Sequence, residues 1–243
     1  MQGKTIIKYF GNSAFQITTE GGKRVLIDPC LTGMDGRGVT RCKPEDIEAI
    51  DVIFVTHAAG DHLGDTYEIA SRLKSPVVCD PAVNWYLNTR GLPKDKVKGS
   101  GWGMRSEVAG VRYQTVESKH ISILRQPACL PISGCPNGYI IYMESGRGIY
   151  HPGDTAIFRD MELFAELYHP DIAMLGIGGF PGFPGELSPE EAALVAKWMN
   201  LKFVFPHHYQ PGEPELQRFV TALARTSPQT QAIVLGQGEE IQL

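Results

Sequence analysis

Short apolar runs recur along the whole chain and predict β-strands. Residues 5–10 and 14–18 alternate between apolar and polar positions, and the turn-forming tripeptide Gly11-Asn12-Ser13 separates them. The later run 52–55 is continuously apolar, which is typical of a strand buried on both faces. The other predicted strands are 24–27, 77–79, 111–116, 139–143, 149–150, 172–175, 203–205 and 232–235.

Helical patterns lie between these clusters of strands. Ser188, Pro189 and Glu191 form a strong start signal, with a capping serine, a proline in the first turn and a glutamate that completes a capping box. The glycine- and proline-rich stretch 176–185 is interpreted as a loop between a strand and this helix. Clustered strands with interspersed helices predict a mixed α/β chain. The expected helices are 44–50, 81–89, 160–168, 188–200 and 213–225.

Composition places the 243-residue chain among ordinary soluble proteins, with 42% hydrophobic and 21% charged residues. A net charge of −4 gives no support to a nucleic-acid or anionic-membrane partner, since both require a dense basic surface. The sequence contains no apolar run of the ~20 residues that a membrane helix needs, and its start lacks the apolar segment of a signal peptide. A cytoplasmic location is therefore expected. Five cysteines without a C-x-x-C pair indicate reduced thiols, and a bond between Cys129 and Cys135 is not favoured.

The most informative polar residues follow the apolar run 52–55. His57, Asp61 and His62 lie there within six positions, in a loop that a buried strand holds rigidly. Two imidazoles and a carboxylate are good ligands for zinc, iron or manganese. A solvated turn with chance histidines is the alternative, and the local pattern favours the metal site.

Three further predicted strands also end in a histidine or an aspartate. His120 follows the run 111–116, Asp154 follows 149–150, and His207 and His208 follow 203–205. Each of these residues alone is typical of a hydrogen-bonded structural position. If the strand ends share one rim of the sheets, however, their side chains converge on a metal site.

Residues 56–62 (THAAGDH) resemble the His-x-His-x-Asp-His loop of the metallo-β-lactamase superfamily, with Ala59 in place of the middle histidine. Residues 11–15 (GNSAF) and 25–29 (VLIDP) resemble the first strands of that superfamily. Other segments resemble its small stand-alone metal-dependent hydrolases, which include the L-ascorbate-6-phosphate lactonase-like proteins. These segments are 31–33 (LTG), 61–65 (DHLGD), 150–155 (YHPGDT) and 206–209 (PHHY).

The resemblance implies a single domain over residues 1–243, folded as a four-layer αββα sandwich with its active site at one edge of the sheets. It also implies two metal positions that share a bridging residue: His57 and His120 at the first, Asp61, His62 and His208 at the second, and Asp154 as the bridge. A metal-bound water would be the nucleophile, with Asp61 orienting it and Tyr209 near the mouth of the site.

Ala59 departs from the superfamily pattern because its methyl group cannot bind a metal ion. The second position keeps its ligands, so one tightly bound ion and a weak or empty first position are expected. Zinc is the first expectation, with manganese or iron as alternatives. Asn12, His151, His207 or a water molecule could replace the missing ligand.

The predicted function is metal-dependent hydrolysis of a small ester, lactone, amide or phosphodiester, because the fold itself does not select among them. The partner would be a small-molecule substrate, and a homo-oligomer is left open. The alternative is an altered protein of this fold that binds a metal or ligand, or regulates, without catalysis. Ala59 motivates this alternative, and metal content discriminates between the two. Redox chemistry at iron ranks last, because 243 residues leave no room for a flavin-binding companion domain.

Overall fold

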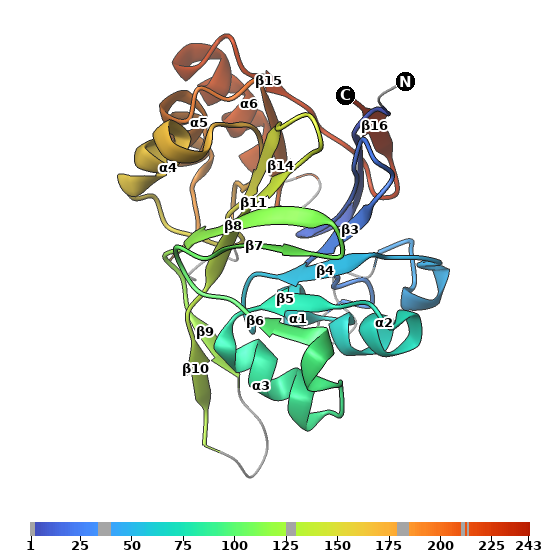
Figure 1. The fold of residues 1–243 in the computed structure, drawn as a ribbon. Coiled ribbons are helices and arrows are strands. Elements are labelled where there is room, and N and C mark those ends of the chain that lie inside the picture. The colour runs from blue at the N-terminus through green and yellow to red at the C-terminus, as the bar shows by residue number, and fades with distance from the viewer. Residues whose placement is uncertain (1–2, 34–39, 125–129, 179–184, 210–211, 213) are drawn as a thin grey trace.

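Two large β-sheets lie face to face at the centre of the computed structural model (Figure 1), which describes residues 3–33, 40–124, 130–178, 185–209, 212 and 214–243. The first sheet has the strand order β16-β1-β2-β3-β4-β5-β6 and the second β15-β14-β13-β12-β11-β8-β7. The strands of the first sheet are β1 (Ile6–Gly11), β2 (Ala14–Thr18), β3 (Arg24–Ile27), β4 (Val52–Val55), β5 (Val77–Cys79), β6 (Val97–Gly99) and β16 (Glu240–Gln242). Those of the second are β7 (Arg105–Val108), β8 (Val111–Glu117), β11 (Asn137–Tyr142), β12 (Gly148–His151), β13 (Pro170–Gly176), β14 (Phe203–His207) and β15 (Gln231–Ala232).

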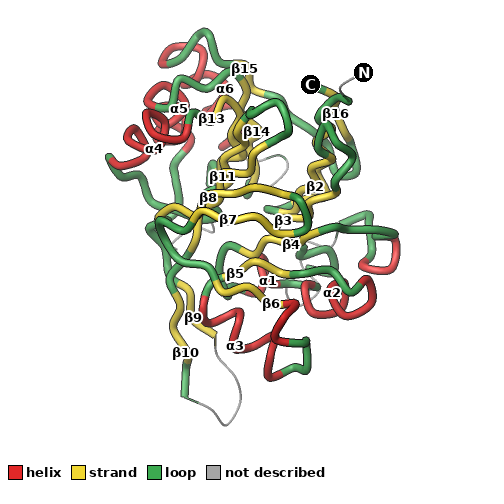
Figure 2. The backbone as a smooth tube through the Cα atoms, viewed as in Figure 1, coloured by secondary structure: helices red, strands yellow, loops and turns green. Residues whose placement is uncertain are grey.

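Helices cover the outer face of each sheet, and a small hairpin of β9 (Ser122–Leu124) and β10 (Ile132–Gly134) extends from the body (Figure 2). The helices over the first sheet are α1 (Gly60–Leu63), α2 (Thr66–Leu73) and α3 (Pro81–Thr89). Those over the second are α4 (Asp160–Tyr168), α5 (Pro189–Trp198) and α6 (Glu215–Thr226). Single 3-10 turns occur at Pro44–Asp46 and Lys94–Lys96. The four layers are thus helix, sheet, sheet and helix, as expected.

Three apolar clusters hold these layers together. In β4, Val52 and Phe54 face the space between the sheets, whereas Ile53 and Val55 face the helices α2 and α3. Successive strand residues point to opposite faces, so a strand that is covered on both sides is apolar at every position. The third cluster lies between the second sheet and α4, α5 and α6.

Strand direction brings several loops to one edge of the sandwich. In the first sheet, β3, β4, β5 and β6 run parallel, and in the second sheet β12, β13, β14 and β15 do the same. β8 runs in the direction of β12, because both strands pair antiparallel with β11. The loops after β4, β8, β12 and β14 carry the polar residues that the sequence singled out.

Many predicted elements have the observed bounds, including β2, β3, β4, β5, α3 and α4. The capping box of α5 is confirmed, since the Ser188 hydroxyl accepts a hydrogen bond from the Glu191 N–H and the Glu191 carboxylate accepts one from the Ser188 N–H. Sequence reasoning missed α1, α2, β6, β7, β9, β10 and β16. β7 carries exposed polar residues at a sheet edge and therefore lacks an apolar pattern. Among the described helices, none combines the length and apolar character needed to cross a bilayer.

Candidate metal centre

The loop after β4 carries three of the candidate ligands. It turns directly into α1, whose first turn contains Asp61 and His62, while the Ala59 carbonyl accepts hydrogen bonds from the N–H groups of His62 and Leu63. Ala59 itself has an extended backbone and caps this turn without a side-chain hydrogen bond. The helical turn directs His62 into the sandwich, where it is fully buried.

The six candidate ligands form two clusters that share one residue. In the first, ligand atoms of His57, His120 and Asp154 lie within 4.8 Å of one another. In the second, those of Asp61, His62, Asp154 and His208 meet the same limit. Asp154 belongs to both, so the structure places it between the two clusters.

Two of the four imidazoles are held through Nδ1 by a network around Asp28, a buried carboxylate at the end of β3. Asp28 Oδ2 lies 2.8 Å from His62 Nδ1 and accepts a hydrogen bond from the Thr56 hydroxyl, also 2.8 Å long. His57 Nδ1 lies 3.0 Å from the Thr56 hydroxyl oxygen, which has already given its proton to Asp28 and therefore accepts. Both rings thus carry the proton on Nδ1 and present Nε2 for binding.

The other two imidazoles contact oxygen atoms from the loop that precedes α5. His120 Nδ1 donates to the Gly185 carbonyl at 3.2 Å. His208 Nδ1 lies 3.1 Å from Glu186 Oε2 and 3.3 Å from the Gly178 carbonyl oxygen. Acceptors at Nδ1 keep a proton on that nitrogen, so Nε2 is the atom through which each ring would bind a metal ion, as is usual around metal-binding histidines.

Nitrogen and oxygen atoms on the inner side of these residues lack ordinary hydrogen-bond partners. His57 Nε2 and Asp154 Oδ1 are buried atoms without one, whereas His62 Nε2 lies 3.1 Å from Asp154 Oδ2 inside the same cluster. Buried polar atoms rarely stay unpaired, and two imidazole nitrogens with carboxylate oxygens suit a divalent cation of the zinc type. The residues present therefore fit a metal ion.

Electrostatics divides the histidines into two kinds. Burial alone lowers the pKa of His62, but the charges of Asp154, Asp28 and Asp61 raise it well above the ordinary value. The pKa of His208 is likewise raised well above its ordinary value, because Asp154, Asp61 and Glu186 outweigh the effect of burial. Burial and the neighbouring His62 lower the pKa of His57 to about 3, so His57 is neutral at pH 7.

The carboxylates of the second cluster remain ionised. Burial raises the pKa of Asp61, but His62 and His208 outweigh it and bring the pKa below its usual range. The pKa of Asp154 is also lowered, because the charges of His208 and His62 exceed the effect of burial. Anionic carboxylates beside protonated imidazoles are the charge pattern of a cation site, because a bound cation takes the place of the imidazolium protons.

A comparison with known proteins identifies the family. The sequence model described as "Beta-lactamase superfamily domain" matches residues 23–209. The UPF0173 metal-dependent hydrolase of Pyrococcus abyssi is 36% identical over 250 residues, which cover 98% of this chain and 99% of the relative. This chain belongs to the metallo-β-lactamase superfamily.

Other similar proteins agree with this assignment. The UPF0173 metal-dependent hydrolase of Rubrobacter xylanophilus is 34% identical over 224 residues, 88% of each chain. The solved structure of Igni18, a metallo hydrolase from Ignicoccus hospitalis, is similar with a TM-score of 0.81 and 26% identity over 99% of this chain and 98% of that one. An isothiocyanate hydrolase from Delia radicum gut bacteria shares the fold alone, with a TM-score of 0.70 and 16% identity over 97% of this chain and 98% of that one. The expected superfamily, fold and enzyme class, a metal-dependent hydrolase, are confirmed.

Among the described histidines, His151 and His207 belong to neither ligand cluster. The Asn12 amide donates to the Asp61 carbonyl oxygen at 3.1 Å, which steadies the superfamily loop from outside. His151 Nδ1 accepts from the Gly153 N–H, and His207 Nδ1 contacts the Ser13 hydroxyl. The rings of His151 and His207 stack on each other inside the sandwich, so His207 and His208 point in different directions.

Tyr209 is half-buried and packs against the cluster below α5 and α6. Burial raises its pKa, so its hydroxyl stays protonated at neutral pH. Its catalytic role stays a prediction. Cys129 lies outside the described residues, and Cys135 is a free thiol.

Sequence reasoning missed two residues that hold the ligands. Asp28 ends a buried strand, as His57 and Asp154 do, so the same strand-end signal could have found it. Glu186 precedes the helix-start signal of α5 without a pattern of its own. Only the fold shows that Glu186 contacts His208.

Proposed function

We propose that His57, His120 and Asp154 form one metal position of this hydrolase and that Asp61, His62, His208 and Asp154 form the other. The observation that carries the proposal is the pair of ligand clusters sharing Asp154, in which the buried atoms His57 Nε2 and Asp154 Oδ1 have no hydrogen-bond partner. Ala59 leaves the first position with three ligand residues, whereas the second position has four, so the first position binds its metal ion more weakly. Zinc is the first candidate and manganese or iron the alternatives.

The reaction is hydrolysis by an activated water. A divalent cation, when bound here, lowers the pKa of a coordinated water and polarises the oxygen of the scissile group. Asp61 stays ionised at neutral pH and lies at the edge of its cluster, so its carboxylate accepts a hydrogen bond and orients the attacking water. Asp28 and Glu186 hold the rings of His62 and His208 in the binding tautomer.

A small uncharged carbonyl compound, such as an ester, lactone or amide, is the proposed substrate, with a phosphodiester second. The nearby Lys119 directs its ammonium group over the Phe158 ring, 4.9 Å from the centroid. Residues 1–243 are proposed to act as one domain, and a cytoplasmic location stays a prediction.

The decisive experiment compares Asp61→Ala with the unaltered protein. Loss of this carboxylate should remove the tightly bound ion, so metal per chain falls from about one to near zero, and hydrolysis is lost with it. Elemental analysis after dialysis measures the metal content, and a panel of esters and lactones measures activity.

Asp51→Ala provides the matched control. Asp51 also accepts hydrogen bonds, from Lys23 Nζ and the Arg24 N–H, but it lies outside both clusters. This variant should keep the metal and the activity. Full metal content in Asp61→Ala would contradict the ligand assignment.

A further inference from the structure

A cavity of about 700 Å³ opens beside the first ligand cluster. Its wall includes His120, which is one of the proposed ligands, and Gly185, whose carbonyl fixes the His120 ring. The volume lies within the ~300–1,000 Å³ typical of small-molecule sites. A molecule in this cavity is therefore adjacent to the proposed reaction centre.

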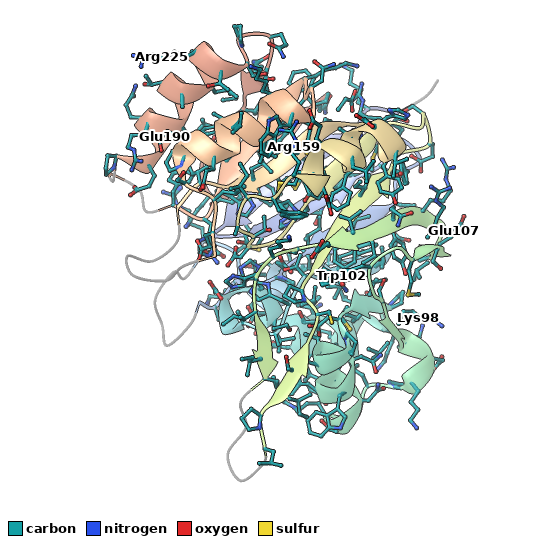
Figure 3. The ribbon with its side chains drawn as sticks, turned by 90° about the vertical axis from the view of Figure 1, so that its left-hand side faces the viewer. Lys98, Trp102, Glu107, Arg159, Glu190 and Arg225 are labelled. Atoms are coloured by element: carbon teal, nitrogen blue, oxygen red, sulfur yellow. The ribbon has the colours of Figure 1, made fainter. Side chains whose placement is uncertain are left out.

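One side of the cavity is an apolar surface built around Trp102. The indole N–H donates to the Pro136 carbonyl at 2.7 Å, which fixes the ring although 48% of the residue is exposed. Ile121, Cys135 and Pro136 complete this surface, and 53% of Ile121 is exposed. Figure 3 shows Trp102 on the open face of the molecule, between the helices above and the β9–β10 hairpin below. A fixed, exposed indole is a ready surface for a flat apolar group.

Most polar groups in the cavity wall are already engaged or negatively charged, so the cavity is poorly suited to bind an anion. The Ser118 hydroxyl donates to the Asp154 carbonyl at 2.7 Å. Lys119 also lines the cavity, but its ammonium group lies over the ring of Phe158, which is not part of the cavity wall. Glu117, at the end of β8, lines the cavity and repels negative charge.

We infer that this cavity binds a flat, uncharged, apolar part of the substrate, such as an aryl group, against Trp102 and Ile121. The catalytic role of this cavity rests on the proposed function, because a substrate held here has its ester or amide bond beside His120. It narrows the substrate class to neutral carbonyl compounds with an apolar substituent. Glu117 selects against substrates whose substituent is anionic.

Ligand binding can be tested without metal or turnover by protection of Cys135. Alkylation of Cys135 by iodoacetamide is followed by peptide mapping while 2-naphthol is titrated into the metal-free protein. The half-buried Cys42, which does not line the cavity, serves as the internal reference. Saturable protection of Cys135 alone is expected, and absence of protection overturns the inference.

Matched variants locate the bound probe. Trp102→Ala and Ile121→Ser should each raise the 2-naphthol concentration for half-protection about tenfold. The controls Trp85→Ala and Ile123→Ser also remove exposed apolar side chains, but outside the cavity, and should leave it unchanged. If the control variants raised the half-protection concentration as much as Trp102→Ala and Ile121→Ser, the proposed binding surface would be contradicted.

Charge selection is tested with 2-naphthalenesulfonate, which adds a fixed negative charge to the same ring system. It should protect at least fivefold less well than 2-naphthol, and Glu117→Gln should remove most of that difference. Equal protection by both probes in the unaltered protein would overturn the assignment of a neutral substrate group.

Turnover separates this inference from the proposed function. In the metal-loaded protein, the preference in kcat/KM for 2-naphthyl acetate over ethyl acetate should fall about tenfold in Trp102→Ala. If 2-naphthol protects Cys135 but neither ester is hydrolysed, the binding cavity stands and the proposed ester chemistry fails. If both esters are hydrolysed without a preference that Trp102 controls, the hydrolase stands and the cavity assignment fails.

Discussion

Replacement of Asp28 by asparagine should weaken metal binding although Asp28 is not itself a proposed ligand. The buried carboxylate has three donors around it: the Thr56 N–H and hydroxyl, each at 2.8 Å, and His62 Nδ1, also at 2.8 Å. Oδ1 faces the backbone N–H, which can only donate, so the asparagine oxygen must occupy that side. The new NH₂ group therefore takes the position of Oδ2.

At that position, the NH₂ group donates to His62 Nδ1 and to the Thr56 hydroxyl oxygen. His62 must then carry its proton on Nε2, the atom that faces Asp154 at 3.1 Å. The Thr56 hydroxyl is released from its present acceptor and can donate to His57 Nδ1, which moves the His57 proton to Nε2 as well. Loss of an outer hydrogen bond of this kind typically costs about 10- to 100-fold in metal affinity, or about 1.4–2.7 kcal/mol.

Competition with a chromophoric chelator measures the zinc affinity, and ¹⁵N shifts of the imidazole rings report the tautomer in the metal-free protein. Asp65→Asn is the matched control, because Asp65 also accepts from two backbone N–H groups and a threonine hydroxyl, those of Leu31 and Thr32, without contacting a histidine. The control should keep the affinity. An affinity in Asp28→Asn equal to that of Asp65→Asn would refute the tautomer argument.

Three further predictions concern the two metal positions. Ala59→His should raise bound metal from about one toward two per chain by elemental analysis, and unchanged occupancy would mean that the first position is already filled or cannot accept the ring. His120→Ala should lower the metal affinity of the weak first position much more than that of the tight second position in a metal titration. Equal losses of affinity at both would contradict the difference between the two positions. Binding at the cluster of His62 should release protons at neutral pH, because that imidazole is protonated there, whereas His57 is already neutral with a pKa of about 3. Calorimetry in buffers of different ionisation enthalpy counts these protons, and a buffer-independent heat would exclude the charged state of His62.

The raised pKa of His62 also predicts how the stability of the metal-free protein depends on pH. The folded-state pKa of His62 lies well above the ordinary value of 6.5, so its ion pairs stabilise the fold fully below about pH 6.5. This contribution is lost as the pH rises through the raised pKa. Below about pH 7.5 the unfolded chain still protonates histidines that are neutral in the folded protein, such as His57 and His207, and this opposes the effect. Chemical denaturation between pH 7.5 and 9 should therefore show decreasing stability, and an increase over that interval would exclude the assigned charge state.

The sequence by itself determined the strands and the chemical character of their ends. The run 52–55 is apolar at every position because both of its faces are covered. This local property can be recognised from the sequence without a structure. The ligand types His57, Asp61 and His62 follow directly after it, so their proximity is fixed by chain connectivity.

The tertiary structure decided which distant groups meet. Asp154 and His208 reach the cluster of His62 because parallel strands deliver their ends to one edge, and only the pairing of β8, β11 and β12 puts His120 on that edge. Such contacts depend on strand order and direction, so they cannot be predicted from the spacing of residues along the sequence. The cavity beside His120 is likewise a product of the fold, since Trp102, Ile121 and Pro136 come from three separate loops or strand ends.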